Sequence, residues 1–350
     1  MFRKIAYFTL ALFAVFVIVG FLLPREVHVE RRITIDRPPS TVFTLVNGFE
    51  RFESWSPWAP LDPEAVYTYS GPASGVGAKL AWSGDPRLVG SGWQEIIESQ
   101  PYTLVRMQLD FEQQGRAQSY FQLVGVGRGT ELIWGFDTDL VEGQGVFGGL
   151  LARYFGLFFD RWIGSDYERG LASLKRLAES LPATDFGDLA VEVVDVPAGN
   201  MLYVAGNALD AAPDMASRLA TAYAEIREAM ADGDLSQAGP PMAITQRLAN
   251  GRIELLAAIP VEGPAQELKG EVRAGRAPSG KAVRFVHRGP YEQMAPGYEK
   301  LAAYLAAHGL EEGDVSWEQY VSEPSDTPAD EMVTHIYALI QASDTAAEPR

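Results

Sequence analysis

The residues best placed to do chemistry lie in one short stretch near the end of the sequence, Ser316-Trp317-Glu318-Gln319-Tyr320-Val321-Ser322-Glu323-Pro324. Aromatic and β-branched residues alternate there with polar ones, which predicts a strand that Pro324 ends. Strict alternation puts Glu318 and Tyr320 on one face and Trp317 on the other. A carboxylate beside an aromatic ring suits a cation or a polar aromatic ligand. The alternative is a solvated glutamate on a half-exposed strand.

This stretch also resembles the closing strands of a known family, the GyrI-like (AraC effector-binding) domains. The matching motifs are Trp317-Glu318-x-Tyr320, Pro324, Thr334-His335-Ile336-Tyr337 and the turn Arg288-Gly289-Pro290-Tyr291. The resemblance covers roughly residues 188–340. It implies that Glu318 lies in a ligand cleft and faces cationic or amphipathic small molecules. One branch of the family uses such a glutamate for hydrolysis.

Five residues are therefore candidates for binding a ligand in this cleft: Glu318, Tyr320, Trp317, Tyr291 and Tyr337. Trp317 and Tyr320 point in opposite directions on a regular strand. Both rings can touch one ligand only if a bulge or twist intervenes.

The elements that precede this region predict a separate domain between residues 26 and 181. A first strand ends at Ile35, and Ser40 is expected to cap a short helix that runs through Val46. Strands separated by glycine and proline then predict an antiparallel meander up to about Asp137. Apolar residues at helical spacing predict a long closing helix from about residue 160 to 181.

These residues resemble the SRPBCC (START-like, polyketide cyclase/dehydrase-like) family, which has the helix-grip fold. The motifs are Ile35-x-x-Pro38-Pro39, Trp55-Ser56-Pro57-Trp58, Gly75-Val76-Gly77-Ala78, Trp82-Ser83-Gly84, Gly129-Thr130-x-x-x-x-Trp134 and Glu168-Arg169-Gly170-Leu171. The resemblance implies a hydrophobic ligand held between a curved sheet and the long helix. Trp55, Trp58, Trp82 and Trp134 are candidates to line that cavity, since aromatic walls suit apolar ligands. The alternative is that these rings are core packing.

An uncharged apolar run from Ile5 to Leu23 comes before both domains. At ~1.5 Å per residue it spans close to the ~30 Å hydrocarbon core of a bilayer. Ile18-Val19-Gly20 is a poor cleavage site, so an uncleaved signal anchor is favoured over a cleaved signal peptide. The short basic N-terminus favours a cytoplasmic start, with the soluble domains on the periplasmic side of the inner membrane.

A glycine-rich and aromatic stretch, Gly143 to Phe159, lies just before the predicted long helix. Its apolar side chains have two possible roles: they close the helix-grip cavity or they rest on the bilayer.

The last part of the chain contains an internal repeat. Val196-Pro197-Ala198-Gly199 and Ala277-Pro278-Ser279-Gly280 each lead into a predicted strand-helix-strand-strand unit. A duplicated unit predicts a pseudo-twofold domain with a cleft where its halves meet. The expected organisation is α+β, with an anchor (1–25), a helix-grip domain (26–181), a linker (182–187), a GyrI-like domain (188–341) and a disordered tail (342–350).

Composition narrows the remaining possibilities. The chain has no cysteine and four histidines scattered along it, so neither a metal site nor a cofactor is expected. The net charge is −17, of which about −14 falls after residue 182. An acidic domain repels nucleic acid, and the partners expected are a small molecule and a membrane.

Three functions follow from these observations. The first is a membrane-anchored protein that binds a hydrophobic or a cationic, amphipathic small molecule. The second is a hydrolase in which Glu318 acts as general base. The third is a non-catalytic membrane scaffold. The sequence leaves the ligand and the oligomeric state open.

Overall fold

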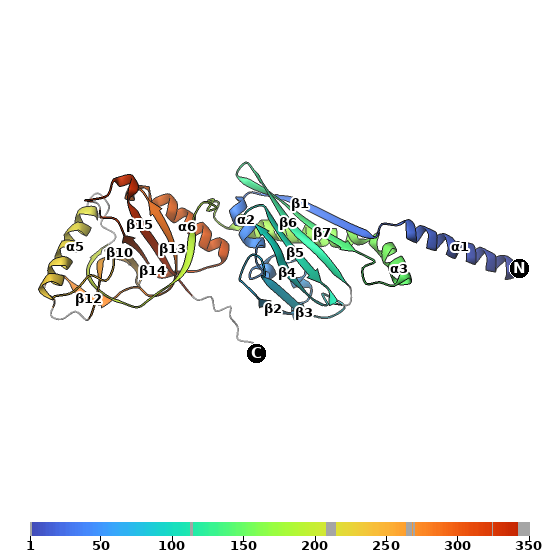
Figure 1. Ribbon diagram of the computed structural model, residues 1–350, viewed down its shortest axis with the longest axis horizontal. Helices are drawn as coiled ribbons and strands as arrows, with labels where there is room; N and C mark the ends of the chain where they lie inside the picture. The colour runs from blue at the N-terminus through green and yellow to red at the C-terminus, as the bar shows by residue number, and fades with distance from the viewer. Residues whose placement is uncertain are drawn as a thin grey trace. The chain divides into compact units, whose positions relative to one another are not determined.

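A computed structural model describes residues 2–112, 115–207, 215–263, 268, 270–323 and 325–341. The chain divides into two compact units, Met1–Gly187 and Asp188–Arg350 (Figure 1). Pro324, at the predicted strand end, and the predicted tail 342–350 lie outside the described residues.

The first unit opens with helix α1, Phe2–Leu22. Its mean hydropathy reaches 2.6, and it is long and apolar enough to cross a membrane, a property that signal sequences share. Nearly all of its side chains are exposed, in contrast to a core helix of a globular domain.

Seven antiparallel strands of the first unit form one sheet in the order β1-β7-β6-β5-β4-β3-β2. Their bounds are β1 Glu26–Ile35, β2 Val66–Ser70, β3 Lys79–Ser83, β4 Ser91–Gln100, β5 Leu104–Asp110, β6 Arg116–Val126 and β7 Gly129–Asp139. Buried and exposed residues alternate along β6, because one face of the sheet packs on the core. β2 was not predicted. It is an edge strand of the sheet, and four of its five residues are exposed.

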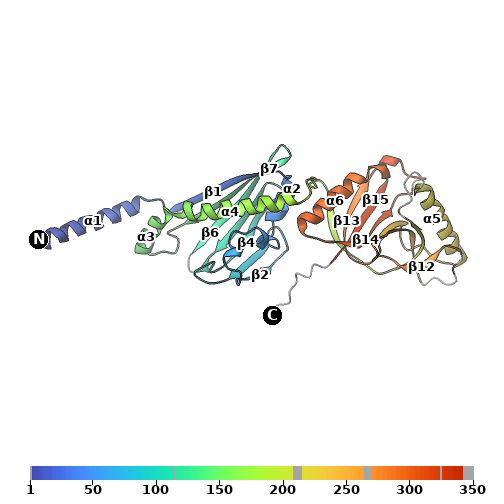
Figure 2. The same ribbon diagram turned by 180° about the vertical axis from the view of Figure 1, so that it is seen from behind.

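Helices cover the buried face of this sheet (Figure 2). They are α2 Pro39–Val46 and α4 Phe159–Ser180, with short 3-10 turns η1 Phe52–Ser54 and η2 Ala59–Leu61. α3 Val146–Gly156 lies beyond the end of the sheet, between α1 and α4. α4 buries Tyr167, Leu171, Leu174 and Ala178, a stripe at helical spacing that faces the sheet. This is the long closing helix that the sequence predicts.

The predicted cap at Ser40 is wrong. α2 begins with Pro39 in its first turn, and the capping position is Pro38, which makes no side-chain cap. Proline suits this turn because its missing N–H has no partner there in any case. Ser40 instead donates a hydrogen bond of 2.7 Å from its Oγ to Asp185 Oδ1.

The second unit is an eight-stranded sheet in the order β12-β9-β11-β10-β14-β15-β13-β8. The bounds are β8 Val191–Val196, β9 Asn200–Asn207, β10 Met242–Arg247, β11 Ile253–Val261, β12 Arg273–Arg276, β13 Gly280–Arg288, β14 Glu312–Tyr320 and β15 Val333–Ile340. Helices α5 Met215–Asp232 and α6 Ala295–His308 flank β14 in Figure 1, and η4 Tyr291–Gln293 and η5 Ala329–Glu331 complete the unit. Together with the first unit, this confirms the α+β class.

The order of the strands displays the internal repeat. β9, β11 and β10 on one side correspond to β13, β15 and β14 on the other, and the halves meet where β10 pairs with β14. The leading strands exchange places: β8 pairs with β13 of the second half, and β12 pairs with β9 of the first. The sequence repeat was predicted, whereas this exchange was not.

Candidate ligand-binding sites

The Glu318 carboxylate lies at the centre of the second unit, on the strand where the two halves meet. Both oxygens accept hydrogen bonds from phenols: Tyr298 Oη to Oε1 at 2.6 Å and Tyr320 Oη to Oε2 at 2.6 Å. Glu318 and Tyr320 share one face of β14, as alternation predicts, while Tyr298 comes from α6. The carboxylate is half-buried, so it is held in place without being sealed from a ligand.

Two further tyrosines surround this pair. Tyr291 from η4 lies edge-on to the Tyr320 ring at 5.3 Å between centroids, and Tyr223 from α5 does so at 6.5 Å. We call Glu318 with Tyr223, Tyr291, Tyr298 and Tyr320 the tyrosine cluster. Within the part of the chain that the structure describes, the buried Tyr223 hydroxyl has no hydrogen-bond partner. Such a group is costly unless something binds to it.

Electrostatics in the tyrosine cluster keep the phenols protonated. Burial, and after it the negative charge of Glu318, raises the pKa of Tyr320 and of Tyr298 above the usual tyrosine value. The same two causes, in the same order, raise the pKa of Tyr223 and of Tyr291. The phenols therefore act as neutral donors.

Two of the predicted ligand-binding residues lie on the opposite face of the sheet. Trp317 is 4% exposed and stacks on Tyr337 with 4.6 Å between ring centroids. The irregularity in the β14–β15 pairing falls before Ser316, so alternation is regular from Ser316 to Tyr320. Trp317 and Tyr337 thus cannot share a ligand with Glu318, and they pack in an apolar cluster with Met242 and Ile244.

Sequence reasoning missed Tyr223 and Tyr298, the members of the tyrosine cluster that come from helices. Both lie at positions that helical periodicity alone assigns to packing. Their approach to Glu318 depends on how α5 and α6 dock on the sheet, and no local spacing encodes that.

The first unit contains a cavity of about 560 Å³ between the sheet and α4. Its walls are mostly aromatic and aliphatic, and the residues that carry them include Trp58, Trp82, Phe111, Phe155, Trp162 and Tyr167. A volume in this range suits a small organic ligand. The polar Asp166 also lines it and accepts a hydrogen bond of 3.0 Å from Trp58 Nε1.

Two of the four predicted tryptophans line this cavity, Trp58 and Trp82. The other two, Trp55 and Trp134, are 2% and 3% exposed and form core packing instead. Trp134 stacks on Tyr167 at 3.8 Å and donates from Nε1 to Ser119 Oγ at 3.0 Å. Trp55 packs against Trp134, and Trp134 packs against the cavity-lining Tyr167 from the core side.

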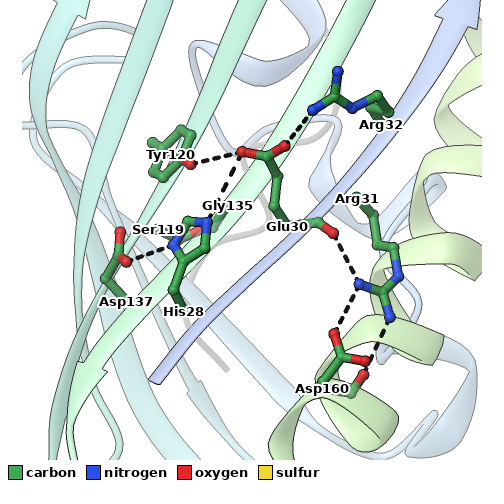
Figure 3. Close-up of polar contacts among 9 residues, drawn as sticks. All are labelled: His28, Glu30, Arg31, Arg32, Ser119, Tyr120, Gly135, Asp137 and Asp160. Atoms are coloured by element: carbon green, nitrogen blue, oxygen red, sulfur yellow. Dashed lines mark hydrogen bonds and ion pairs between the residues drawn. The ribbon is translucent and has the colours of Figure 1, made fainter. Parts of the chain in front are cut away.

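An arginine on β1 fastens α4, which forms one wall of the cavity (Figure 3). Arg31 donates from Nη1 to Asp160 Oδ1 at 2.9 Å and from Nε to Glu168 Oε1 at 2.7 Å. Its guanidinium lies directly over Gly164, where a side chain would collide with it. Hydrogen bonding to Arg31 lowers the pKa of the Asp160 carboxyl below its usual value.

A separate polar network runs along the outer side of the same strand (Figure 3). His28 Nδ1 lies 2.7 Å from Asp137 Oδ1, and Glu30 accepts from Arg32 at 2.7 Å and from Tyr120 at 3.3 Å. In the described ranges, no group of three or more histidine, aspartate or glutamate side chains is placed to hold a metal ion.

Comparison with family models assigns each unit to a family. Residues 26–179 match the family described as polyketide cyclase / dehydrase and lipid transport, and residues 190–341 match the GyrI-like small molecule binding domain. The chain therefore carries an SRPBCC domain followed by a GyrI-like domain, as the motifs predict, and both are domains of small-molecule binding families. No curated protein matches the chain.

Solved structures resemble parts of the chain at low identity. EcmrR in its complex with DNA is 16% identical with a TM-score of 0.38, covering 44% of this chain and 57% of that one. A hydrolase encoded by lin2189 from Listeria innocua is 15% identical with a TM-score of 0.33, covering 43% and 91%. The Aha1 dimer from Colwellia psychrerythraea is 18% identical with a TM-score of 0.31, covering 44% and 96%. At these scores the likenesses carry no argument about function.

Proposed function

We propose that this chain is a membrane-anchored binding protein that holds an apolar or amphipathic small molecule in the helix-grip cavity. The observation that carries the proposal is the cavity of about 560 Å³, enclosed by aromatic side chains between the sheet and α4. Burying apolar ligand surface against such walls stabilises a complex by roughly 25 cal/mol per Å².

The anchoring part of the proposal rests on α1. Arg3 and Lys4 come before its apolar core, which supports a cytoplasmic start with the domains outside the inner membrane. α1 also makes specific contacts with the folded unit: Arg153 Nη1 donates to the carbonyl oxygens of Phe21 and Leu23, each at 2.9 Å. Cleavage as a signal peptide would remove these contacts, so retention is favoured.

Titration of the full chain in detergent micelles with an environment-sensitive naphthylamine probe tests the cavity. Ala117→Phe adds a ring to the cavity wall, and Val124→Phe adds the same ring on the exposed face of the same strand. We expect Ala117→Phe to abolish probe binding and Val124→Phe to leave it unchanged. Equal binding by the Ala117→Phe protein would overturn the cavity proposal, provided its thermal unfolding still shows a folded first unit.

The tyrosine cluster favours a second site, for an organic cation. A carboxylate held by two phenols, with the rings of Tyr291 and Tyr223 beside it, attracts a cationic group through charge and through the ring faces. The unpaired Tyr223 hydroxyl offers such a ligand one further hydrogen bond. We propose that this acidic unit does not bind DNA, because its negative charge repels the phosphates.

Calorimetric titration with a primary alkylammonium compound, whose N–H groups can donate to the Tyr223 hydroxyl, tests this second site. Glu318→Gln keeps the shape of the cluster but removes its charge, whereas Glu331→Gln removes the same charge at an exposed position. Affinity is expected to fall by about tenfold or more in the first variant, since a desolvated cation–carboxylate pair exceeds ~1.4 kcal/mol. An equal loss of affinity in both variants would show that the net negative charge of the unit, and not the Glu318 site, attracts the cation.

The hydrolase hypothesis for Glu318 is weaker on this geometry. Each carboxylate oxygen already accepts a phenolic hydrogen bond, so a water to be activated must compete with Tyr298 or Tyr320. Turnover of an ester panel that disappears in Glu318→Gln would reverse this ranking. A protein that binds neither probe would favour the scaffold hypothesis.

A further inference from the structure

Helix α3 is fastened to the C-terminal half of α1. Tyr154 stacks on Phe16 with 4.5 Å between ring centroids and donates from Oη to the Phe16 carbonyl at 2.7 Å. Gly20 permits the close approach, because a side chain there would collide with Leu150 and Tyr154. Small residues at a crossing of this kind are typical of helices that pack within membranes. Together with the Arg153 bonds to the end of α1, these contacts fix α3 beside the apolar helix.

The position of this crossing sets the depth of α3. α1 has 21 residues, which at ~1.5 Å per residue matches the ~30 Å hydrocarbon core. Phe16 lies before Leu22 by more than one and a half helical turns, so Tyr154 contacts α1 roughly 9 Å short of its end. If α1 spans the bilayer, part of α3 must therefore lie below the membrane surface.

The side of α3 next to the one that contacts α1 is apolar and exposed. Phe147, Leu151 and Phe155 are 76%, 51% and 58% exposed and recur every four residues, so they form one stripe. Phe158 and Trp162, 51% and 52% exposed, continue it into α4. We call these five residues the apolar stripe. An exposed stripe of this kind suits the boundary between headgroups and acyl chains, where interfacial helices lie ~5–10 Å deep.

The cavity of the first unit reaches the apolar stripe. Phe155 and Trp162 belong both to the apolar stripe and to the cavity wall, and Ala152 of α3 and Leu140 also line it. The pairing of Glu26 with Asp139 puts this end of β7 beside the point where α1 joins β1. α1 joins the sheet at this end (Figure 2). Residues at this end of β7 and in α3 line the cavity, which therefore extends to the end of the sheet that carries the anchor.

We infer that the apolar stripe is immersed in the leaflet on the side of the folded domains, so that the cavity exchanges its ligand directly with the bilayer. The apolar stripe contacts the membrane that α1 crosses. The ligand of the cavity is an acyl-chain amphiphile dissolved in that leaflet. This inference rests on the proposed function, since it requires both the anchor and the cavity.

The absence of cysteine from the chain permits a depth measurement at single introduced cysteines. Phe147→Cys, Leu151→Cys, Phe13→Cys and Val126→Cys would each carry an environment-sensitive fluorophore, with the full chain in nanodiscs of phosphatidylcholine and phosphatidylglycerol. Val126 is 53% exposed, which matches Leu151. It ends β6 and pairs with Gly129 on β7, next to the residue that pairs with Ile35 at the end of β1. The ten residues of β1 put this end of the sheet about 33 Å from the anchor.

Lipids with a doxyl group near the headgroup are expected to quench the labels at residues 147 and 151 several-fold more than the label at residue 126. Iodide in the buffer should show the reverse order. Phe13 reports on α1 and should be quenched by a doxyl group near the chain end. If Phe13 is quenched while 147 and 151 behave like 126, the inference is overturned and the anchor stands. If Phe13 itself is not quenched, the anchor and the inference fail together.

Exchange of the ligand is tested with a fluorescent fatty acid as probe. Leu151→Glu puts a charge into the apolar stripe and does not line the cavity, and Val126→Glu is the matched control. Uptake from the nanodisc bilayer is expected to slow by about tenfold in Leu151→Glu alone, because a charge there opposes immersion. Binding of the same fatty acid supplied in detergent should remain unchanged. Equal uptake rates in all three proteins overturn the inference, and a loss of binding in detergent assigns Leu151 to the cavity instead.

Discussion

The two units of this chain solve the problem of binding in opposite ways. The first encloses space: a sheet and α4 flank a cavity whose walls are mostly aromatic and aliphatic. The second positions charge: β14, α5, α6 and the 3-10 turn η4 bring four phenols around a single carboxylate. Under the proposed function, ligand selection depends on shape and hydrophobicity in the first unit and on polarity in the second. A single amphipathic compound therefore need not bind to both.

Core deletions test whether the two units are separately stable. Leu174→Ala on α4 and Ile226→Ala on α5 both remove fully buried side chains, and each should lower stability by about 2–5 kcal/mol. We expect each variant to shift the unfolding transition of its own unit in differential scanning calorimetry of the full chain. A common shift of a single transition in both variants would contradict this independence.

Within the second unit, two phenol deletions separate satisfied hydroxyls from unsatisfied ones. Tyr320→Phe removes a donor to the Glu318 carboxylate and should cost about 1.5–3 kcal/mol, the range for hydrogen bonds to charged groups. Tyr223→Phe removes a buried hydroxyl without a partner, so stability should hold or rise slightly while cation affinity falls. Chemical denaturation measures the first effect and calorimetric titration the second. Similar stability losses in the two variants would show that the Tyr223 hydroxyl is also satisfied.

Alkaline pH should distinguish the two units through their tyrosines. The folded-state pKa values of Tyr298 and Tyr320 are raised above the unfolded value of about 10. Their contribution to stability is therefore full below pH ~10 and is lost as pH rises beyond it. Burial likewise raises the pKa of Tyr167 in the first unit. Glu318→Gln should reduce the alkaline loss in the second unit and leave the first unchanged, as followed by thermal unfolding between neutral and alkaline pH.

The smallest expected effect concerns the arginine that fastens α4. Arg31→Gln removes ion pairs with two largely exposed carboxylates, and such pairs contribute about 0–1 kcal/mol. Because Arg31 lowers the pKa of Asp160, the stabilisation is present above the unfolded aspartate pKa of about 4 and is lost as pH falls below it. Chemical denaturation should show that the free energy of unfolding differs between wild type and Arg31→Gln at neutral pH and is the same in both at acidic pH.

Much of the fold was predictable because it follows local patterns. Alternation located β14 and placed Glu318 with Tyr320, helical spacing located α4, and the internal repeat located α6. α3 was not predicted as a helix, since Gly148, Gly149 and Gly156 have low helix propensity. Its contacts with α1, through Leu150 and Tyr154, stabilise it instead, and these are tertiary.

The candidate sites were predictable only in part, for the same reason. Trp55 and Trp58 stand three residues apart in one motif, yet one is core and the other is cavity wall. Which ring faces open space depends on the turn formed by η1 and η2 and on how α4 docks. Tyr298 reaches Glu318 across two elements, so no sequence spacing joins them.

The exchange of β8 and β12 between the halves of the second unit has a consequence for synthesis. Val191 on β8 is paired with Phe285 on β13, so β8 leaves the ribosome well before its partner exists. At roughly 5–20 residues per second, this valine-rich segment waits for seconds as an unpaired strand. Exposed strands of this type recruit other chains. The second unit is therefore open to misassembly during that interval, and a holdase chaperone that shields residues 191–196 on the side of the membrane where the unit folds should raise the yield.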